Sequence, residues 1–173
     1  MTRGFFIGRF QPFHLGHLKA LEWILGKVNE VIIGIGSAQY SHSLQNPFTA
    51  GERVEMIWRV LRTRGLLSRC IITLVPDTNG RHSIWVAMVE HYSPRFDIVF
   101  SNDPLTQRLF KEAGYRVEGI PFFKRDLYNA TRIRKLMLRG DEWKEYVPKE
   151  VAEYIEEIDG VNRLREIYLR LQQ

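Results

Sequence analysis

The feature that most constrains this chain is a regular alternation between short apolar runs and longer segments with helical periodicity. The short runs are predicted strands, because they are apolar and rich in β-branched or aromatic residues. They cover residues 4–8, 30–36, 69–75, 96–100 and 115–120. Apolar strands that are each followed by an amphipathic helix are typical of a parallel sheet with helices on both faces.

Predicted helices follow the strands in turn, at residues 15–28, 50–64, 83–92 and 104–114. From residue 130 the pattern is helical almost to the end, with breaks at Gly140, Pro148 and Gly160. Thr49 and Glu52 have the spacing of a capping box, which predicts a helix start at this point. We therefore predict an α/β fold with a Rossmann-like parallel sheet. It forms a single domain over residues 1–173, and its C-terminal part, about 129–173, is helical.

The composition of the 173-residue chain excludes some classes of protein. The apolar runs are too short to cross a membrane, and we expect no signal peptide. Cys70 is the only cysteine, so no internal disulfide is expected. The net charge of +5 suits a site for phosphates, and the sequence has no block of lysine and arginine. We expect a cytoplasmic protein that binds neither membrane nor nucleic acid.

The first predicted loop, Gly8 to His17, carries the most specific pattern. In a parallel sheet, ligands bind beyond the carboxyl ends of the strands, where this loop is expected to lie. Gly8 allows a turn and the close approach of a ligand. His14 and His17 share one face of a helix N-terminus, whose free N–H groups attract phosphate, and Gly16 leaves room beside them. Arg9 and Phe10 complete the predicted phosphate site.

This loop has two other interpretations. It could be a tight turn whose histidines only cap a helix, but the glycines, the arginine and the position after a strand together favour a site. It could instead bind zinc. Two histidines need further ligands, and Cys70 alone supplies no supporting cluster.

The loops after the other strands carry weaker signals. Gly36, Ser37 and Gln39 follow the second strand and form either a turn or a ligand-binding loop. Trp85, near a helix start, is either a core residue or a surface on which a flat ring stacks. Ser101 and Asn102 read as part of a helix cap that could also contact a nucleotide base or ribose.

A second anion site is predicted where the late helical region begins. Asn129 is a candidate cap, and Thr131 and Arg134 lie three residues apart on one helix face. A hydroxyl, an arginine and free N–H groups together suit a phosphate. The alternative is a capped helix with solvated arginines.

Taken together, the segment from Gly8 to His17 resembles the signature of the nucleotidyltransferase superfamily with the HxGH motif. The run Asn129 to Arg134 resembles its second phosphate motif. The segments 35–39, 47–53 and 83–86 extend the likeness to the archaeal type of nicotinamide-nucleotide adenylyltransferase. The resemblance covers residues 3 to about 164 and implies the nucleotidyltransferase fold.

The resemblance also implies a reaction: ATP and nicotinamide mononucleotide (NMN) are converted to NAD and pyrophosphate. It implies direct in-line attack, with charge stabilised by the residues assigned as catalytic: His14, His17, Arg9 and Arg134. The residues assigned to ATP are Gly8, Arg9, Phe10, His14, Gly16, His17, Ser101, Asn102, Thr131 and Arg134. Those assigned to NMN are Gly36, Ser37, Gln39, His82, Trp85 and Phe123. Mg²⁺ held mainly by the ATP phosphates, and a hexamer, are also implied.

The sequence departs from the family pattern at three places. Asn129-Ala130 replaces Ser-Gly in the second motif, His82 replaces an asparagine before the tryptophan, and Gln45 replaces a basic residue.

Three rival functions remain. A phosphopantetheine or FMN adenylyltransferase would share the first motif. A nucleotide-binding regulator that also binds DNA would need a DNA-reading module. A fragment of an aminoacyl-tRNA synthetase would need a lysine-rich second motif and a tRNA-binding module.

Overall fold

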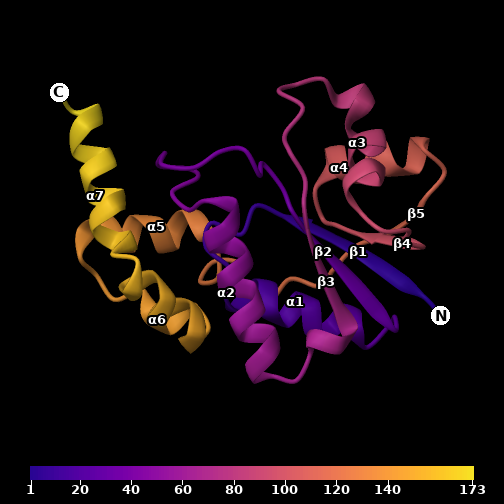
Figure 1. The fold of residues 1–173 in the computed structure, drawn as a ribbon, viewed down its shortest axis with the longest axis horizontal. Helices are drawn as coiled ribbons and strands as arrows, with labels where there is room; N and C mark the ends of the chain where they lie inside the picture. The colour runs from indigo at the N-terminus through magenta and orange to yellow at the C-terminus, as the bar shows by residue number, and fades with distance from the viewer.

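The computed structural model describes residues 1–173 and contains a five-stranded parallel sheet (Figure 1). The strands are β1 (Arg3–Gly8), β2 (Glu30–Ile35), β3 (Cys70–Leu74), β4 (Ile98–Phe100) and β5 (Arg116–Glu118). Their order in the sheet is β3-β2-β1-β4-β5. This confirms the α/β fold and the parallel sheet. The strand order reverses at β1, which lies between β2 and β4.

Neighbouring side chains of the central strands point to opposite faces of the sheet, as the pleat requires. Phe6 and Ile33 belong to the larger core, together with α1 (Leu15–Leu25) and α2 (Ala50–Thr63). Phe5 and Ile32 belong to a second core, together with α3 (Trp85–Tyr92) and α4 (Pro104–Glu112). Both faces are therefore covered, which explains why these strands are apolar throughout.

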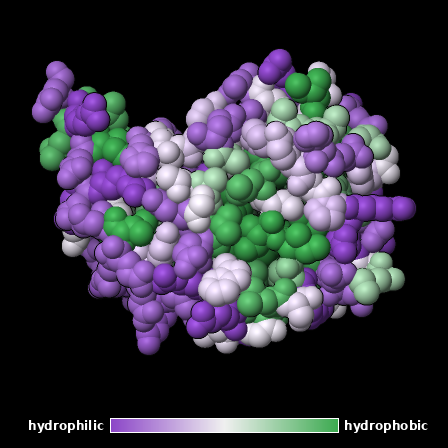
Figure 2. All heavy atoms as spheres, viewed as in Figure 1, coloured by the Kyte–Doolittle hydropathy of each residue, from purple (hydrophilic) through white to green (hydrophobic).

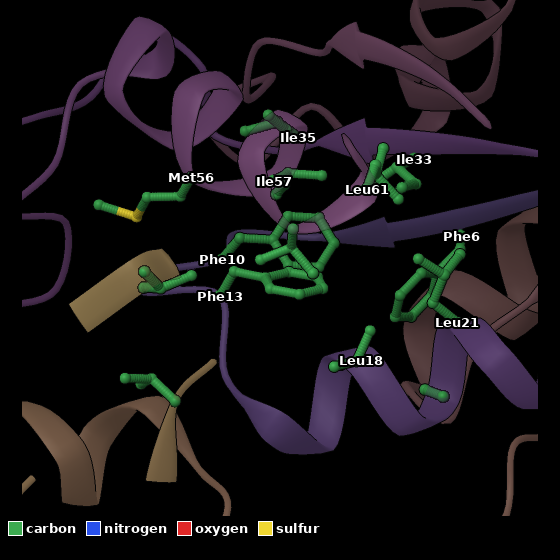
Figure 3. Close-up of a cluster of buried hydrophobic side chains, with 14 of the residues drawn as sticks. Phe6, Phe10, Phe13, Leu18, Leu21, Ile33, Ile35, Met56, Ile57 and Leu61 are labelled. Atoms are coloured by element: carbon green, nitrogen blue, oxygen red, sulfur yellow. The ribbon is translucent and has the colours of Figure 1, made fainter. Parts of the chain in front are cut away.

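The larger core extends into the loop after β1. Phe10 and Phe13 lie between the sheet and α2, with Met56 and Ile57 beside them (Figure 3). Phe10 is 1% exposed and Phe13 is fully buried. The loop is thus anchored by two aromatic side chains, and its polar residues are left at the rim of the sheet.

The C-terminal region forms three helices, α5 (Ala130–Arg139), α6 (Lys149–Glu157) and α7 (Gly160–Leu171), beside α2 (Figure 1). Their buried residues join the same core as α1 and α2. The break predicted at Gly160 is present between α6 and α7, where Asp159 adopts the left-handed conformation and Gly160 is the first residue of α7. A Cβ at Gly160 would come within 2.9 Å of the ring of Phe48, so glycine allows the close approach of α7.

Several predicted boundaries shift inward. The first helix ends at Leu25 and not at Val28, because Gly26 caps it. The helix expected from Ser83 starts with a 3-10 turn, His82–Ile84, before α3. Strands β4 and β5 pair over only three residues each, so the predicted strands at 96–100 and 115–120 were too long. Phe96 is apolar because it is buried in the second core, not because it belongs to the ladder.

No helix of the structure is both long enough and apolar enough to cross a membrane.

Candidate active site

Two pockets open at the carboxyl end of the sheet, on either side of the loop that follows β1. The first has a volume of about 430 Å³ and the second about 400 Å³. They share four lining residues: Ile7, Arg9, Ser101 and Asp103. These residues lie at the ends of β1 and β4, where the strand order reverses, and open α/β sheets bind ligands at such a point.

His14 and His17 line the first pocket and hold each other in place. The backbone N–H of His14 donates to Nδ1 of His17 at 3.1 Å, and the N–H of His17 donates to Nδ1 of His14 at 3.3 Å. This is a capping box built from two imidazoles at the start of α1. The rings stack with their centroids 3.5 Å apart.

The hydrogen bonds assign the tautomer of both rings. Because each Nδ1 accepts a backbone hydrogen bond, each neutral ring carries its proton on Nε2. Burial lowers the pKa of His14 to about 3. Burial also lowers the pKa of His17 well below its usual value, and the charge of His14 adds to this effect. Both rings are therefore neutral near pH 7, and each offers an Nε2–H donor.

Two glycines make this arrangement possible. A Cβ on Gly16 would lie 2.9 Å from Cε1 of His14 and 3.0 Å from Cβ of Tyr128, so the first ring fits only beside a glycine. A Cβ on Gly8 would meet the ring of Phe10 at 2.9 Å. Gly8 thus leaves room for a protein side chain that folds back over the strand end. Phe10 itself is buried in the core and is one of the residues that line the first pocket.

Thr131 and Arg134 line the first pocket together with the histidines and belong to the first turns of α5. Arg134 is 8% exposed and donates through Nη1 to the carbonyl of Gln11 at 2.9 Å. Its Nη2 lies 3.4 Å from Oγ1 of Thr131. The tertiary structure thus brings the two predicted anion motifs into one pocket, although Arg134 and Gln11 are 123 positions apart.

The altered residues at the start of α5 still form a regular helix start. The side chain of Asn129 caps the helix by accepting from the N–H of Arg132 at 2.8 Å. Ala130 is the first helical residue and has no positive φ. Asparagine therefore replaces serine as a cap, and the helix start does not depend on a glycine.

Arginine dominates the charge of this region. Arg9 is exposed on the wall shared by the pockets and makes no side-chain hydrogen bond or ion pair within the chain. Burial, with the charge of Arg9 adding to it, lowers the pKa of Arg134 to about 10, so Arg134 is cationic at neutral pH. A pocket with cations that lack carboxylate partners is suited to a polyanion.

The second pocket contains the residues expected after β2 and β3. Gly36, Ser37, His82 and Trp85 all line it. The ring of Trp85 packs edge-on against Phe110, with centroids 5.5 Å apart, while the same side chain borders the pocket. The two interpretations of Trp85, core residue and stacking surface, are therefore compatible. A Cβ on Gly36 would meet no protein atom closer than 3.6 Å.

Four candidate residues are placed or held differently from the others of their groups. Gly8, assigned to ATP, lines the second pocket and not the first. Gln39 does not line either pocket, because its side chain is paired with the backbone of Asp77 in both directions, at 2.8 and 2.9 Å. Asn102 borders the first pocket, but its amide is paired with the backbone of Ile120. Phe123 lines the first pocket and not the second, where Trp85 lies.

Two residues that support the site were not singled out from the sequence. Gln11 is 2% exposed and exchanges two hydrogen bonds of 2.9 Å with the backbone of Phe48. Arg53 is fully buried in α2 under the ends of β1 and β2. A signal for Arg53 exists in the sequence, since it occupies the apolar helix stripe of Met56, Ile57 and Val60.

No group of three or more His, Cys, Asp or Glu side chains is placed to hold a metal ion. The chain therefore offers no all-protein cage for a divalent cation. Mg²⁺ commonly binds through substrate phosphates with few protein ligands, and the donor set here fits only that mode.

The sequence and the fold also match known proteins. Residues 5–136 match the cytidylyltransferase-like family model. A nicotinamide-nucleotide adenylyltransferase of Pyrococcus horikoshii is 52% identical over 172 residues, covering 99% of this chain and 92% of that protein. One of Saccharolobus solfataricus is 54% identical, covering 96% of this chain and 97% of that protein.

A solved structure is also similar. It is a bifunctional NMN adenylyltransferase/ADP ribose pyrophosphatase from Francisella tularensis, complexed with AMP and a manganese ion. The TM-score is 0.77 at 27% identity, over 95% of this chain. The match spans 52% of the bifunctional chain, so it concerns about half of that protein.

Proposed function

Because the chain belongs to the nicotinamide-nucleotide adenylyltransferases of the cytidylyltransferase-like family, we propose that it transfers the adenylyl group of ATP to NMN. The products are NAD and pyrophosphate, and the reaction is a step of NAD biosynthesis. The near full-length identity to relatives of that name supports the acceptor as well as the donor.

The observation that carries the proposal is the pair of adjoining pockets with Arg9 on their common wall. ATP occupies the first pocket, with its triphosphate between the histidines and Arg134. NMN occupies the second pocket, with its ring near Trp85 and its phosphate toward Arg9. An oxygen of the NMN phosphate then faces the α-phosphorus of ATP across the shared wall.

In the reaction, that oxygen attacks the α-phosphorus while the bond from the α-phosphorus to the bridging oxygen of the β-phosphate breaks. Pyrophosphate leaves with that electron pair. The nucleophile is already an anion, so no side chain has to remove a proton. Positioning the two phosphates and stabilising the charge that develops on the leaving group account for the catalysis.

Each polar side chain of the first pocket has a part in this scheme. Nε2–H of His14 and of His17 donate to phosphate oxygens as neutral groups, which the tautomer supports. Arg134 supplies a fixed positive charge, and Thr131 and the free N–H groups at the start of α5 add donors. Arg9, with no partner in the chain, binds phosphate from the shared wall.

The remaining assignments follow from pocket position. Gly36, Ser37 and His82 contact NMN, and Ser101 lies between the two nucleotides. Phe123 and Asn102 border the ATP side, and Gln39 supports the NMN pocket through Asp77 without contacting the substrate. A divalent cation, Mg²⁺, neutralises the ATP phosphates when bound with them.

Incubation of the protein with ATP and each acceptor in turn tests the function. We expect NAD and pyrophosphate in equal amounts with NMN, and no adenylyl product with phosphopantetheine or FMN. Transfer to either of those acceptors, or tight DNA binding without pyrophosphate release, would contradict the proposal.

Assembly and location are also proposed. The family resemblance supports a hexamer in the cytoplasm. Apolar side chains gather at the centre of the view in Figure 2, where the edge strand β3 and α2 lie. Trp58, Leu67 and Leu74 are between 37% and 38% exposed. Light scattering gives the mass, and a monomer at micromolar concentration would contradict the assembly.

A further inference from the structure

Arg53 is a buried cation without a carboxylate partner, and every N–H of its guanidinium is used. The side chain is 0% exposed. Nε donates to the carbonyl of Thr49 at 3.2 Å, within its own helix. A guanidinium has five N–H groups, so four remain for the rest of the molecule.

Those four donors hold the loops at the ends of two neighbouring strands. Nη1 donates to the carbonyls of Arg9, at 2.9 Å, and Gly36, at 2.8 Å. Nη2 donates to the carbonyls of Ser37, at 3.3 Å, and Tyr40, at 3.4 Å. One rigid planar group therefore sets the spacing between the end of β1 and the end of β2.

The residues held in this way border the second pocket. Gly36 and Ser37 line that pocket alone, and Arg9 lies on the wall that it shares with the first. None of the acceptors belongs to the part of the first pocket formed by His14, His17 and Arg134. The guanidinium therefore acts on the pocket proposed for NMN and on the wall that separates the two pockets.

We infer that Arg53 is a positioning residue for the adenylyl transfer, because its fork holds the NMN pocket in register with Arg9. This inference rests on the proposed function. The planar geometry is essential: a lysine at this position keeps a charge but has only three donors on one nitrogen, which cannot span the same carbonyls. Buried carbonyls without donors would then let the two loops separate.

The experiment compares Arg53→Lys and Arg53→Gln with Arg163→Lys as a matched control. Arg163 also supports the start of α2, through paired contacts of 2.7 and 2.8 Å with Glu52, but it lines neither pocket. Steady-state rates are measured per folded protein, at a temperature well below each variant's unfolding midpoint, with ATP and NMN varied separately.

For both Arg53 variants we expect kcat/KM for NMN to fall at least tenfold, with a KM for NMN that rises more than the KM for ATP, because Gly36 and Ser37 border only the second pocket while Arg9 borders both. For Arg163→Lys we expect a lower unfolding midpoint and unchanged KM values. Equal KM values for NMN in wild type and Arg53 variants would overturn the inference. So would failure of both variants to fold, since Arg53 would then serve folding alone. If the wild type forms no NAD, the proposed function itself fails.

Discussion

The backbone N–H groups of His14 and His17 each donate to the imidazole of the other residue, at 3.1 and 3.3 Å. One pair of side chains thus caps α1 through Nδ1 and lines the first pocket with rings whose Nε2–H groups are not used in the cap. The capping contacts use Nδ1 of each ring and the proposed phosphate contacts use Nε2, so substitution can separate the two roles.

His17→Asn should preserve the fold and lower kcat by about 10²–10³, the usual effect of losing one such donor. The side-chain oxygen of asparagine can accept the N–H of His14 in place of Nδ1, but nothing replaces Nε2–H. Steady-state kinetics and thermal unfolding are measured together. His17→Gln serves as a control, because its amide nitrogen reaches further and should restore part of the rate. Normal turnover of His17→Asn would remove this ring from the mechanism.

Stability should fall as the pH is lowered from about 6.5 toward 3. Burial lowers the pKa of His14 from 6.5 to about 3, so in this range the unfolded chain binds a proton that the folded chain does not. The free energy of unfolding then decreases by up to about 1.4 kcal/mol for each pH unit, and it is unaffected by this group above pH 6.5.

Urea unfolding between pH 5.0 and 7.0 measures this slope above the range in which carboxylates titrate. The His14→Asn variant is the comparison and should show a flatter profile. Identical profiles for the variant and the wild type would mean that His14 is not buried as a neutral ring.

Arg134→Lys should raise the KM for ATP about tenfold and leave the KM for NMN unchanged. Arg134 holds the carbonyl of Gln11 with Nη1 and contacts Oγ1 of Thr131 with Nη2, and its remaining N–H groups are available to a phosphate. A lysine ammonium keeps the charge but loses this fork. Arg132→Lys is the control, since Arg132 packs against Tyr146 and lines neither pocket. Equal effects of the two substitutions on the KM for ATP would contradict the assignment.

Gly36→Ala should raise the KM for NMN severalfold without loss of stability. A Cβ at Gly36 lies in ordinary contact with protein atoms, at 3.6 Å or more, so the methyl group disturbs only what enters the second pocket. Gly51→Ala is the control, because a Cβ there meets nothing within 4 Å and alanine favours the helix. Calorimetry and kinetics on both variants check this prediction, which an unchanged KM for NMN would refute.

Most of the fold was predictable because its determinants are local. Strand and helix periods, the Thr49–Glu52 capping box and the cap at Asn129 each depend on residues a few positions apart. The reversal of strand order at β1 depends on which strands pair, and so it came from the structure. The short lengths of β4 and β5 also came from the structure, because a strand extends only as far as it pairs with its neighbouring strand.

The determinants of the candidate site are likewise partly local and partly tertiary. The residue types and spacing between Gly8 and His17 predicted a phosphate site after the first strand, because a helix N-terminus and its side chains are formed by one short segment. Only the tertiary structure decided which side chains share a pocket and which are held by distant backbone carbonyls. Arg53 meets acceptors up to 44 positions away, and Phe123 joins the histidines' pocket. Such contacts depend on chain packing, which the pattern of a single segment does not encode.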